Sequence, residues 1–202
     1  MTAGDGGGAV ALIGHGGDAM RAIAVACAEH GVAVALATRE KTSEQEFAVQ
    51  SIANEVWVIG SEHFVRVMDA GDPTAAAAFA DEVCDRLGRC KAAVVLAAPP
   101  LEAPIDELSP DEWEAALRAG LTVPFLAAQA FARVLERDGG GAIVFHGQGD
   151  ETVLPAVVSS AALQAMATRL EATWGPRGVH VRCLDGDSLT VAAAQVLAAL
   201  NA

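Results

Sequence analysis

The 202-residue chain is predicted to form one α/β domain built on a Rossmann-like, doubly wound parallel sheet of about six strands. Three observations predict this fold. Short runs of Val, Ile, Leu and Ala alternate with longer helical patterns along the whole sequence. The short runs lack strict apolar–polar alternation, which is typical of strands buried on both faces of a parallel sheet. The connections are short, which favours right-handed strand–helix–strand units.

Each element follows from its own pattern. Six apolar runs predict strands at Ala9–Ile13, Val32–Ala37, Phe64–Met68, Ala92–Ala97, Ala142–His146 and His180–Leu184. The intervals predict helices at Ala19–Glu29, Thr42–Val58, Thr74–Leu87, Pro110–Glu136, Ala156–Trp174 and Thr190–Leu200. Ser109 and Pro110 give the clearest start signal, because Ser caps a helix and Pro suits its first position. No repeat or linker interrupts this order, so residues 1–202 are predicted to form a single domain.

The composition narrows the classes of partner and environment. The formal net charge of −13 disfavours a nucleic-acid or anionic-membrane surface, because both require clustered Lys and Arg. The N-terminal "MTAGDGGG" lacks the basic region of a signal peptide, and no apolar run combines the length and the freedom from Gly and Pro expected of a bilayer span. Cys27, Cys84, Cys90 and Cys183 are scattered, so we expect buried or half-buried thiols, no metal site and a cytoplasmic location.

Two predicted helices carry more apolar residues than packing on one sheet face requires. They contain the segments Leu121–Leu135 and Val157–Ala172. One interpretation is the high Ala content of the whole chain, because small exposed residues cost little. The other, which the large side chains favour, is a subunit interface. The residues predicted to form it are Leu121, Phe125, Phe131, Leu135, Met166 and Leu170.

A glycine-rich turn follows the first predicted strand. Gly14-x-Gly16-x-x-Ala19 satisfies the dinucleotide-binding fingerprint, in which glycines let backbone amides approach a pyrophosphate at a helix N-terminus. The match is weak alone, but its strand–turn–helix context is the right one.

The order of several segments carries a resemblance to a known family. The segments are "AVALIGHGGDAMRAIAVACAEHGVAVALATR", "DELSPDEWEAALRAGLTVPFLAAQAF", "GGGAIVFHGQ" and "SSAALQAMATRLEATWGPRGVHVRCL". Together they resemble the short-chain dehydrogenase/reductase family over nearly the whole chain. The resemblance implies a Rossmann-like fold, NAD or NADP as cofactor, and a four-helix bundle formed by the two apolar helices and their counterparts in a partner subunit.

The family spaces its glycines as TGxxxGxG, and this chain departs from that pattern. Anchoring on "RAIA" aligns Ile13 with the Thr and Gly14 with the first Gly, whereas Asp18 and Met20 fall on the second and third. An aspartate repels a pyrophosphate, and a Met side chain occupies space that the backbone contact requires. We therefore expect loss of nucleotide binding, the alternative being simply a solvated Gly-rich turn.

The rest of the implied nucleotide pocket is mixed. Arg39 ends the second strand where the family discriminates NAD from NADP, and an Arg there can pair with a 2′-phosphate. Asp69 matches the acid that contacts adenine in the family, although both residues are also consistent with solvated strand ends. The family's NNAG motif is replaced by Val95-Leu96-Ala97-Ala98, followed by Pro99-Pro100. The sequence thus leaves an adenosine half of a pocket possible, whereas the nicotinamide half is expected to be lost.

The four catalytic positions that the resemblance implies are all substituted. The family uses a Tyr as general acid/base, a Lys four residues later, a Ser that binds the substrate oxygen and an Asn that anchors a water relay. Alignment places Ala156, Ser160, Gln148 and Gly120 at these positions, and the chain contains no Tyr. No proton donor of suitable pKa remains in the implied arrangement, so no catalytic residue is predicted.

Another chemistry remains conceivable at the same edge of the sheet. His146, Asp150 and Glu151 follow the fifth strand, where doubly wound sheets bind ligands, and Ser159 and Ser160 follow at a helix start. A Ser–His–Asp arrangement can be drawn from these residues, but no GxSxG motif accompanies it. Loop hydrogen bonding is the simpler interpretation.

The C-terminal part is expected to be truncated relative to the family. After "VHVRCL" the family's Pro-Gly is Gly186-Asp187, and the chain then proceeds to a final helix without the substrate-covering loop. The resulting hypothesis is that the chain is a degenerate, non-catalytic subunit that pairs with a catalytically complete relative or with itself. We expect it to bind no cofactor. Heteromeric dehydrogenases of this family with one degenerate subunit are known, and the resemblance implies this class of role. The alternatives are a nucleotide-binding sensor using Gly14, Gly16, Arg39 and Asp69, and an enzyme with new chemistry around His146 and Asp150.

Overall fold

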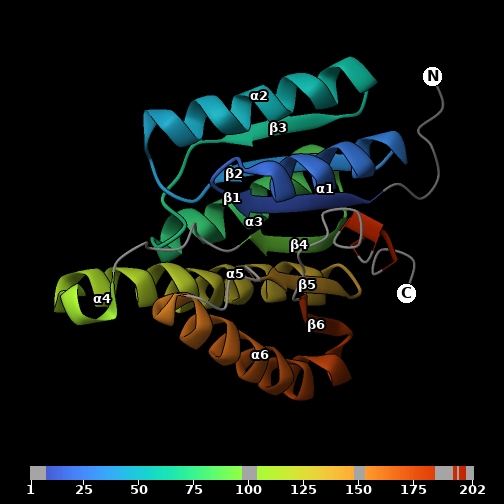
Figure 1. Ribbon diagram of the computed structural model, residues 1–202. Coiled ribbons are helices and arrows are strands. Elements are labelled where there is room, and N and C mark those ends of the chain that lie inside the picture. The colour runs from blue at the N-terminus through green and yellow to red at the C-terminus, as the bar shows by residue number, and fades with distance from the viewer. Residues whose placement is uncertain (1–7, 97–103, 148–152, 185–192, 195, 199–202) are drawn as a thin grey trace.

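Six parallel strands form one sheet in the order β3-β2-β1-β4-β5-β6 (Figure 1). The computed structural model describes residues 8–96, 104–147, 153–184, 193–194 and 196–198. This arrangement confirms the predicted Rossmann-like, doubly wound α/β fold. The strands are β1 (Ala9–Gly14), β2 (Ala33–Thr38), β3 (His63–Arg66), β4 (Cys90–Leu96), β5 (Gly141–His146) and β6 (Val179–Leu184).

Helices cover both faces of the sheet, as the absence of alternation in the strands predicts. One core cluster joins the sheet to α1 and α2, and the other joins it to α3, α5 and α6. The helices are α1 (Asp18–Glu29), α2 (Ser43–Ile59), α3 (Pro73–Leu87), α4 (Pro110–Leu117), α5 (Val123–Arg137) and α6 (Leu154–Trp174).

Side-chain caps fix where several helices begin. The Thr42 hydroxyl accepts from the Gln45 amide at the start of α2, and the Asp72 carboxylate accepts from the Thr74 amide at the start of α3. The predicted Ser109 cap is present and forms a full capping box with Glu112. These bonds satisfy backbone donors that the first helical turn leaves without partners.

The predicted helix Pro110–Glu136 is divided by a π-helical turn, η2 (Arg118–Thr122). Val123 N–H donates to the Arg118 carbonyl, five residues earlier, in place of the usual four. Pro124 supplies the local reason, because it has no N–H to donate to the Gly120 carbonyl and its ring disfavours a regular turn before it. The sequence prediction missed this turn, which brings Gly120 toward α6.

The predicted interface patch is wrong for two of its six residues. Phe131 and Leu135 are fully buried against the sheet, where the Phe131 ring packs edge-on against Phe79. Leu121, Met166 and Leu170 are partly buried against the same cluster, and Phe125 is partly exposed. The error arose because the Ala residues of α5 make it appear apolar all round, although its large side chains mostly share one face.

The continuous helical stretch Pro110–Arg137 is long and apolar enough to cross a membrane by length and composition alone. Core helices of soluble proteins meet the same criterion. This stretch contains Gly120 and Pro124, and α5 packs on the sheet through fully buried Phe131 and Leu135. The length and apolar composition of this stretch are therefore not evidence that it spans a membrane.

Candidate functional site

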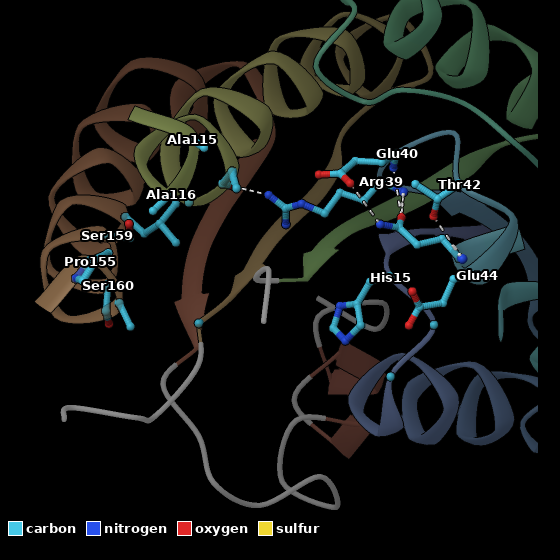
Figure 2. Close-up of a pocket in the computed structure, with 18 of the residues that line it drawn as sticks. His15, Arg39, Glu40, Thr42, Glu44, Ala115, Ala116, Pro155, Ser159 and Ser160 are labelled. Carbon is cyan, nitrogen blue, oxygen red and sulfur yellow. Dashed lines mark hydrogen bonds between the residues drawn. The ribbon is translucent and has the colours of Figure 1, made fainter. Parts of the chain in front are cut away.

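A cavity of about 650 Å³ lies across the carboxyl ends of the central strands (Figure 2). Doubly wound sheets bind their ligands at this edge. Small residues of α4, η2 and α6 line one side, and the glycine turn with the start of α2 lines the other. The lining residues are His15, Gly16, Gly17, Arg39, Glu40, Thr42, Glu44, Gln45, Ala48, Glu112, Ala115, Ala116, Ala119, Gly120, Gly147, Pro155, Ala156, Ser159, Ser160 and Leu163.

The glycine turn joins β1 to α1 with a packed conformation. Gly16 has a φ of +89°, and a Cβ there would collide with Ala48 of α2. The His15 ring lies over Gly17, with Nε2 2.6 Å from the position that a Gly17 Cβ would take. Of the predicted nucleotide-binding glycines, Gly16 therefore lines the cavity, whereas Gly14 is absent from its lining.

Asp18 and Met20 differ in their effect on this turn. The expectation that Met20 fills the pyrophosphate space is wrong, because its side chain is buried in the core with its sulfur beneath Gly14. Asp18 is exposed and pairs with Arg21 at 3.6 Å. Its carboxylate places negative charge in the first turn of α1, where the helix would otherwise attract an anion.

Arg39 is the least expected residue of the cavity. Its side chain is 2% exposed, although it follows the last residue of β2. The guanidinium donates to the Leu96 carbonyl at 2.9 Å and to the Ala119 carbonyl, and so reaches from β2 across the end of β4 to η2. Figure 2 shows the Arg39 side chain extending toward the helical segment that carries Ala115 and Ala116. Burial lowers the pKa of Arg39 to about 10, and the charge of Glu40 offsets part of that effect. A solvated Arg39 poised for a 2′-phosphate is therefore excluded in this conformation.

Asp69 and Arg118 strengthen the same connection. The Asp69 carboxylate accepts from the Gly71 amide of its own loop at 2.8 Å, and Asp69 does not line the cavity. The Arg118 guanidinium, at the start of η2, donates to the Gly71 carbonyl at 3.1 Å. Two arginines thus run in opposite directions between η2 and the β2–β3 side of the sheet. The predicted adenosine half of the pocket is bridged by side chains of the chain itself.

The two α6 positions implied by the resemblance do face the cavity. Ala156 and Ser160, aligned with the family's Tyr and Lys, both line it, together with Ser159. Gly120, aligned with the family's Asn, packs so closely on Ser159 that a Cβ there would collide with the Ser159 hydroxyl. The side of the cavity where the family places its proton relay carries the methyl group of Ala156, the hydroxyl of Ser160 and the hydrogen of Gly120, in place of a phenol, an amine and an amide, respectively.

His146 is not brought together with the serines. It follows Ala142 and Val144, which pack in the cluster with α1, so strand alternation directs His146 to that face. Ser159 and Ser160 lie on α6, whose buried residues belong to the opposite cluster. Gln148, Asp150, Glu151, Ala97, Ala98, Pro99, Pro100, Gly186 and Asp187 lie outside the described residues. The described residues therefore do not bring His146 together with Ser159 or Ser160.

His146 gives the fold a specific acid sensitivity. Burial lowers the pKa of its imidazole, and Nε2 has no hydrogen-bond partner among the described residues. The unfolded chain protonates His146 near pH 6.5, whereas the folded chain protonates it only at a lower pH, so stability falls as the pH falls below about 6.5. Urea unfolding at pH 7.5 and 5.5 should show this loss, with a slope of at most about 1.4 kcal/mol per pH unit from this group. The loss should shrink in His146→Gln; an equal loss in both proteins would assign it elsewhere.

Two of the cysteines, Cys27 and Cys90, are unsuited to metal binding or nucleophilic chemistry. Burial raises the pKa of the Cys27 thiol to about 12 and also raises that of the buried Cys90. Thiolates are the form that reacts and binds metals. Within the described ranges, no group of three or more His, Cys, Asp or Glu residues could hold a metal ion.

Comparison with known families decides the classification. A family model described as enoyl-(acyl carrier protein) reductase matches residues 20–198, beginning just after the glycine turn. The chain belongs to the short-chain dehydrogenase/reductase (SDR) family. D-threitol dehydrogenase of Mycolicibacterium smegmatis is a relative with 32% identity over 121 residues, which cover 57% of this chain and 46% of that enzyme. The alignment thus spans less than half of that SDR.

Solved SDR structures share the fold. A short-chain dehydrogenase from Rhodopseudomonas palustris superposes with a TM-score of 0.82 and 20% identity over 95% of this chain and 90% of that one. An SDR from Mycobacterium marinum gives 0.79 and 24% over 89% and 74%. A 3-ketoacyl-ACP reductase from Sinorhizobium meliloti gives 0.75 and 26% over 87% and 71%. The SDR family normally binds NAD or NADP. The cavity described above is where such binding can be tested in this chain.

Proposed function

We propose that this chain is a non-catalytic SDR subunit that pairs with a catalytically complete SDR and supports it. One observation carries the proposal: the cavity positions that align with the family's catalytic Tyr and Lys are Ala156 and Ser160, in a chain without any Tyr. A methyl group cannot donate a proton, and a serine hydroxyl at the Lys position carries no positive charge to lower a neighbouring pKa. The fold is thus retained without the groups that perform hydride-transfer chemistry.

The nucleotide side of the cavity supports the same role. A bound NAD or NADP would have to displace Arg39 from the Leu96 and Ala119 carbonyls, which would leave two backbone acceptors without their donor. Glu40 and Glu44 line the cavity where an anionic cofactor would approach. Gly16, Gly17 and Arg39 are the groups that would hold phosphates if the cofactor bound, and they would contribute orientation only.

Pairing is assigned chiefly to α6 after the correction above. No charged residue occurs between Leu154 and Thr168, and the helix buries only Pro155, Ser159, Leu163 and Ala167. Its exposed side carries Val157, Ala161, Ala165, Thr168 and Ala172, at helical spacing. An uncharged surface helix that buries so little in its own chain suits close packing against another helix. We place this pairing in the cytoplasm, where the four thiols stay reduced.

Two variants test the pairing. The tagged chain, purified from its native cells, is expected to retain a complete SDR in stoichiometric amount, and Val157→Asp is expected to release it because the new charge is buried at the contact. Ile105→Asp is the matched control, since Ile105 is also exposed but lies before α4. Size-exclusion chromatography with mass spectrometry measures both. Elution of the wild-type chain as a monomer, or equal retention by Val157→Asp and the wild type, would contradict the proposal.

A nucleotide-binding sensor is the second candidate, and the cavity itself favours it. A volume of about 650 Å³ is sufficient for a small-molecule site. Such a sensor would need Arg39 to swing out of the cavity. A nucleotide titration therefore separates the two candidates.

A further inference from the structure

The outward side of α2 carries the three most exposed large apolar side chains among the described residues. Phe47 is 80% exposed, Trp57 70% and Val58 76%. The opposite side of the helix packs on the sheet through Val49, Ile52, Ala53 and Val56. A helix with one buried face ordinarily presents charged residues to water on the other. The α2 helix presents two aromatic rings and a valine as well.

The exposed face of α2 has a defined composition. With 3.6 residues per turn, one set of exposed residues falls within an arc of about 100° and includes no charged side chain. Interface centres are typically depleted in charge and enriched in aromatic residues, with a polar rim. We call this set the α2 face; its residues are Ser43, Phe47, Gln50, Asn54, Trp57 and Val58.

The rim of the α2 face is acidic. Glu44 and Glu46 lie on the first turn beside Phe47, and Glu62 follows the helix. Glu55 is already paired with Arg21 at 3.1 Å. The segment from residue 40 to residue 62 contains Glu40, Glu44, Glu46, Glu55 and Glu62, against Lys41 as its one basic residue.

We propose that the α2 face docks a basic amphipathic helix of another protein. The apolar side chains of such a helix would cover Phe47, Trp57 and Val58, and its Lys or Arg residues would meet the acidic rim. Phe47 and Val58 are eleven residues apart, about 16 Å along the helix, which matches about three turns of a partner helix. A second copy of this chain is a poor occupant, because it would bring acidic rim against acidic rim in a protein of net charge −13.

The α2 face is separate from the proposed SDR pairing surface. In Figure 1, α2 lies at the β3 end of the sheet and α6 at the β6 end. The two surfaces can therefore be occupied at the same time. The docking proposal is independent of whether the chain pairs through α6.

The test uses a synthetic peptide helix of about four turns with Leu at i, i+3 and i+4 positions and Lys elsewhere, titrated calorimetrically into the intact chain. A peptide with Glu in place of Lys is the charge control. The Leu/Lys peptide is expected to bind and the Leu/Glu peptide not. The double variant Trp57→Ser/Val58→Ser is expected to weaken binding at least about tenfold. The reason is that a few large side chains at the centre of an interface contribute most of the binding energy, and this variant removes two of them. Ile105→Ser is the control variant, because the Ile105 side chain is 63% exposed but lies outside the α2 face. It is expected to bind the peptide like the wild type.

Three outcomes would overturn the proposal. One is absence of binding by the Leu/Lys peptide. The second is equal affinity in Trp57→Ser/Val58→Ser and Ile105→Ser, which would show that charge alone attracts the peptide. The third is a wild-type dimer in sedimentation velocity that the double variant abolishes, which would assign the face to self-association. Thermal unfolding by circular dichroism verifies that the exposed substitutions leave the fold intact.

Discussion

Replacing Arg39 with alanine is expected to destabilise the chain by about 2–4 kcal/mol. The substitution removes the donors to the Leu96 and Ala119 carbonyls and opens a void beside a 650 Å³ cavity. For a domain of this size the melting temperature should fall by roughly 4–16 °C. Differential scanning calorimetry measures the change. The expected loss is large because one side chain joins β2, β4 and η2.

Arg177→Ala is the matched control for this experiment. The Arg177 side chain also bonds a residue that is distant in sequence, Glu136 of α5, but it is about half exposed, at 46%. An exposed pair of this kind contributes at most about 1 kcal/mol. Equal melting temperatures for Arg39→Ala and Arg177→Ala would show that Arg39 does not connect the two sides of the cavity. Addition of NADPH should leave the Arg39→Ala melting temperature unchanged, because Ala156 and Ser160 still lack the ribose contacts of the family.

The double variant Ala156→Tyr/Ser160→Lys is expected to show no NADPH-dependent ketone reduction above background. In a functional enzyme a positioned general acid contributes about 10²–10⁴-fold in rate. Here the restored Tyr and Lys would face a cavity whose nucleotide side is still bridged by Arg39 and whose Asn position is Gly120. The rate of NADPH oxidation at 340 nm with a 3-oxoacyl thioester measures the outcome. Activity in this double variant would show that the cavity remains organised for hydride transfer.

Adding Gly120→Asn to the Ala156→Tyr/Ser160→Lys variant is expected to destabilise the fold and to restore no activity. Any Cβ at position 120 collides with both the hydroxyl and the Cβ of Ser159, so η2 and α6 would have to separate. Alongside it, Ser159→Ala/Gly120→Ala tests the steric cause, because it removes the hydroxyl while adding the smallest Cβ. Partial recovery of stability relative to Gly120→Ala alone is the expected result.

The sheet and helix order could be predicted because each element carries its own hydrophobic pattern. The observed strands and helices agree with the predicted runs, apart from shifts of a residue or two at most ends and the division at η2. The predicted helix Thr190–Leu200 lies mostly outside the described residues. The π turn was missed because its cause, the missing N–H of Pro124, does not interrupt the apolar pattern. The interface residues were partly wrong because Ala hides the orientation of α5, whereas only the packed helix shows that Phe131 and Leu135 face the sheet.

The direction of Arg39 could have been inferred from strand alternation. Ala35 and Ala37 pack in the cluster with α3 and α5, and Arg39 continues that parity beyond the end of β2. The same rule places His146 with Ala142 and Val144 on the opposite side. The two hydrogen bonds of the Arg39 guanidinium could not be inferred from the sequence. Their acceptors, the Leu96 and Ala119 carbonyls, lie 57 and 80 residues away in sequence, and the position of Ala119 depends on η2.

Isothermal titration of the wild-type chain with NADPH and NADH tests the central claim most directly. The account predicts no heat of binding at millimolar nucleotide, because Arg39 is engaged with backbone carbonyls, Asp69 with its own loop, and Ala156 and Ser160 offer no family contacts. Arg177→Ala serves as a folded reference with the cavity unchanged. A dissociation constant in the low micromolar range for either nucleotide would contradict the account and establish a functional cofactor site.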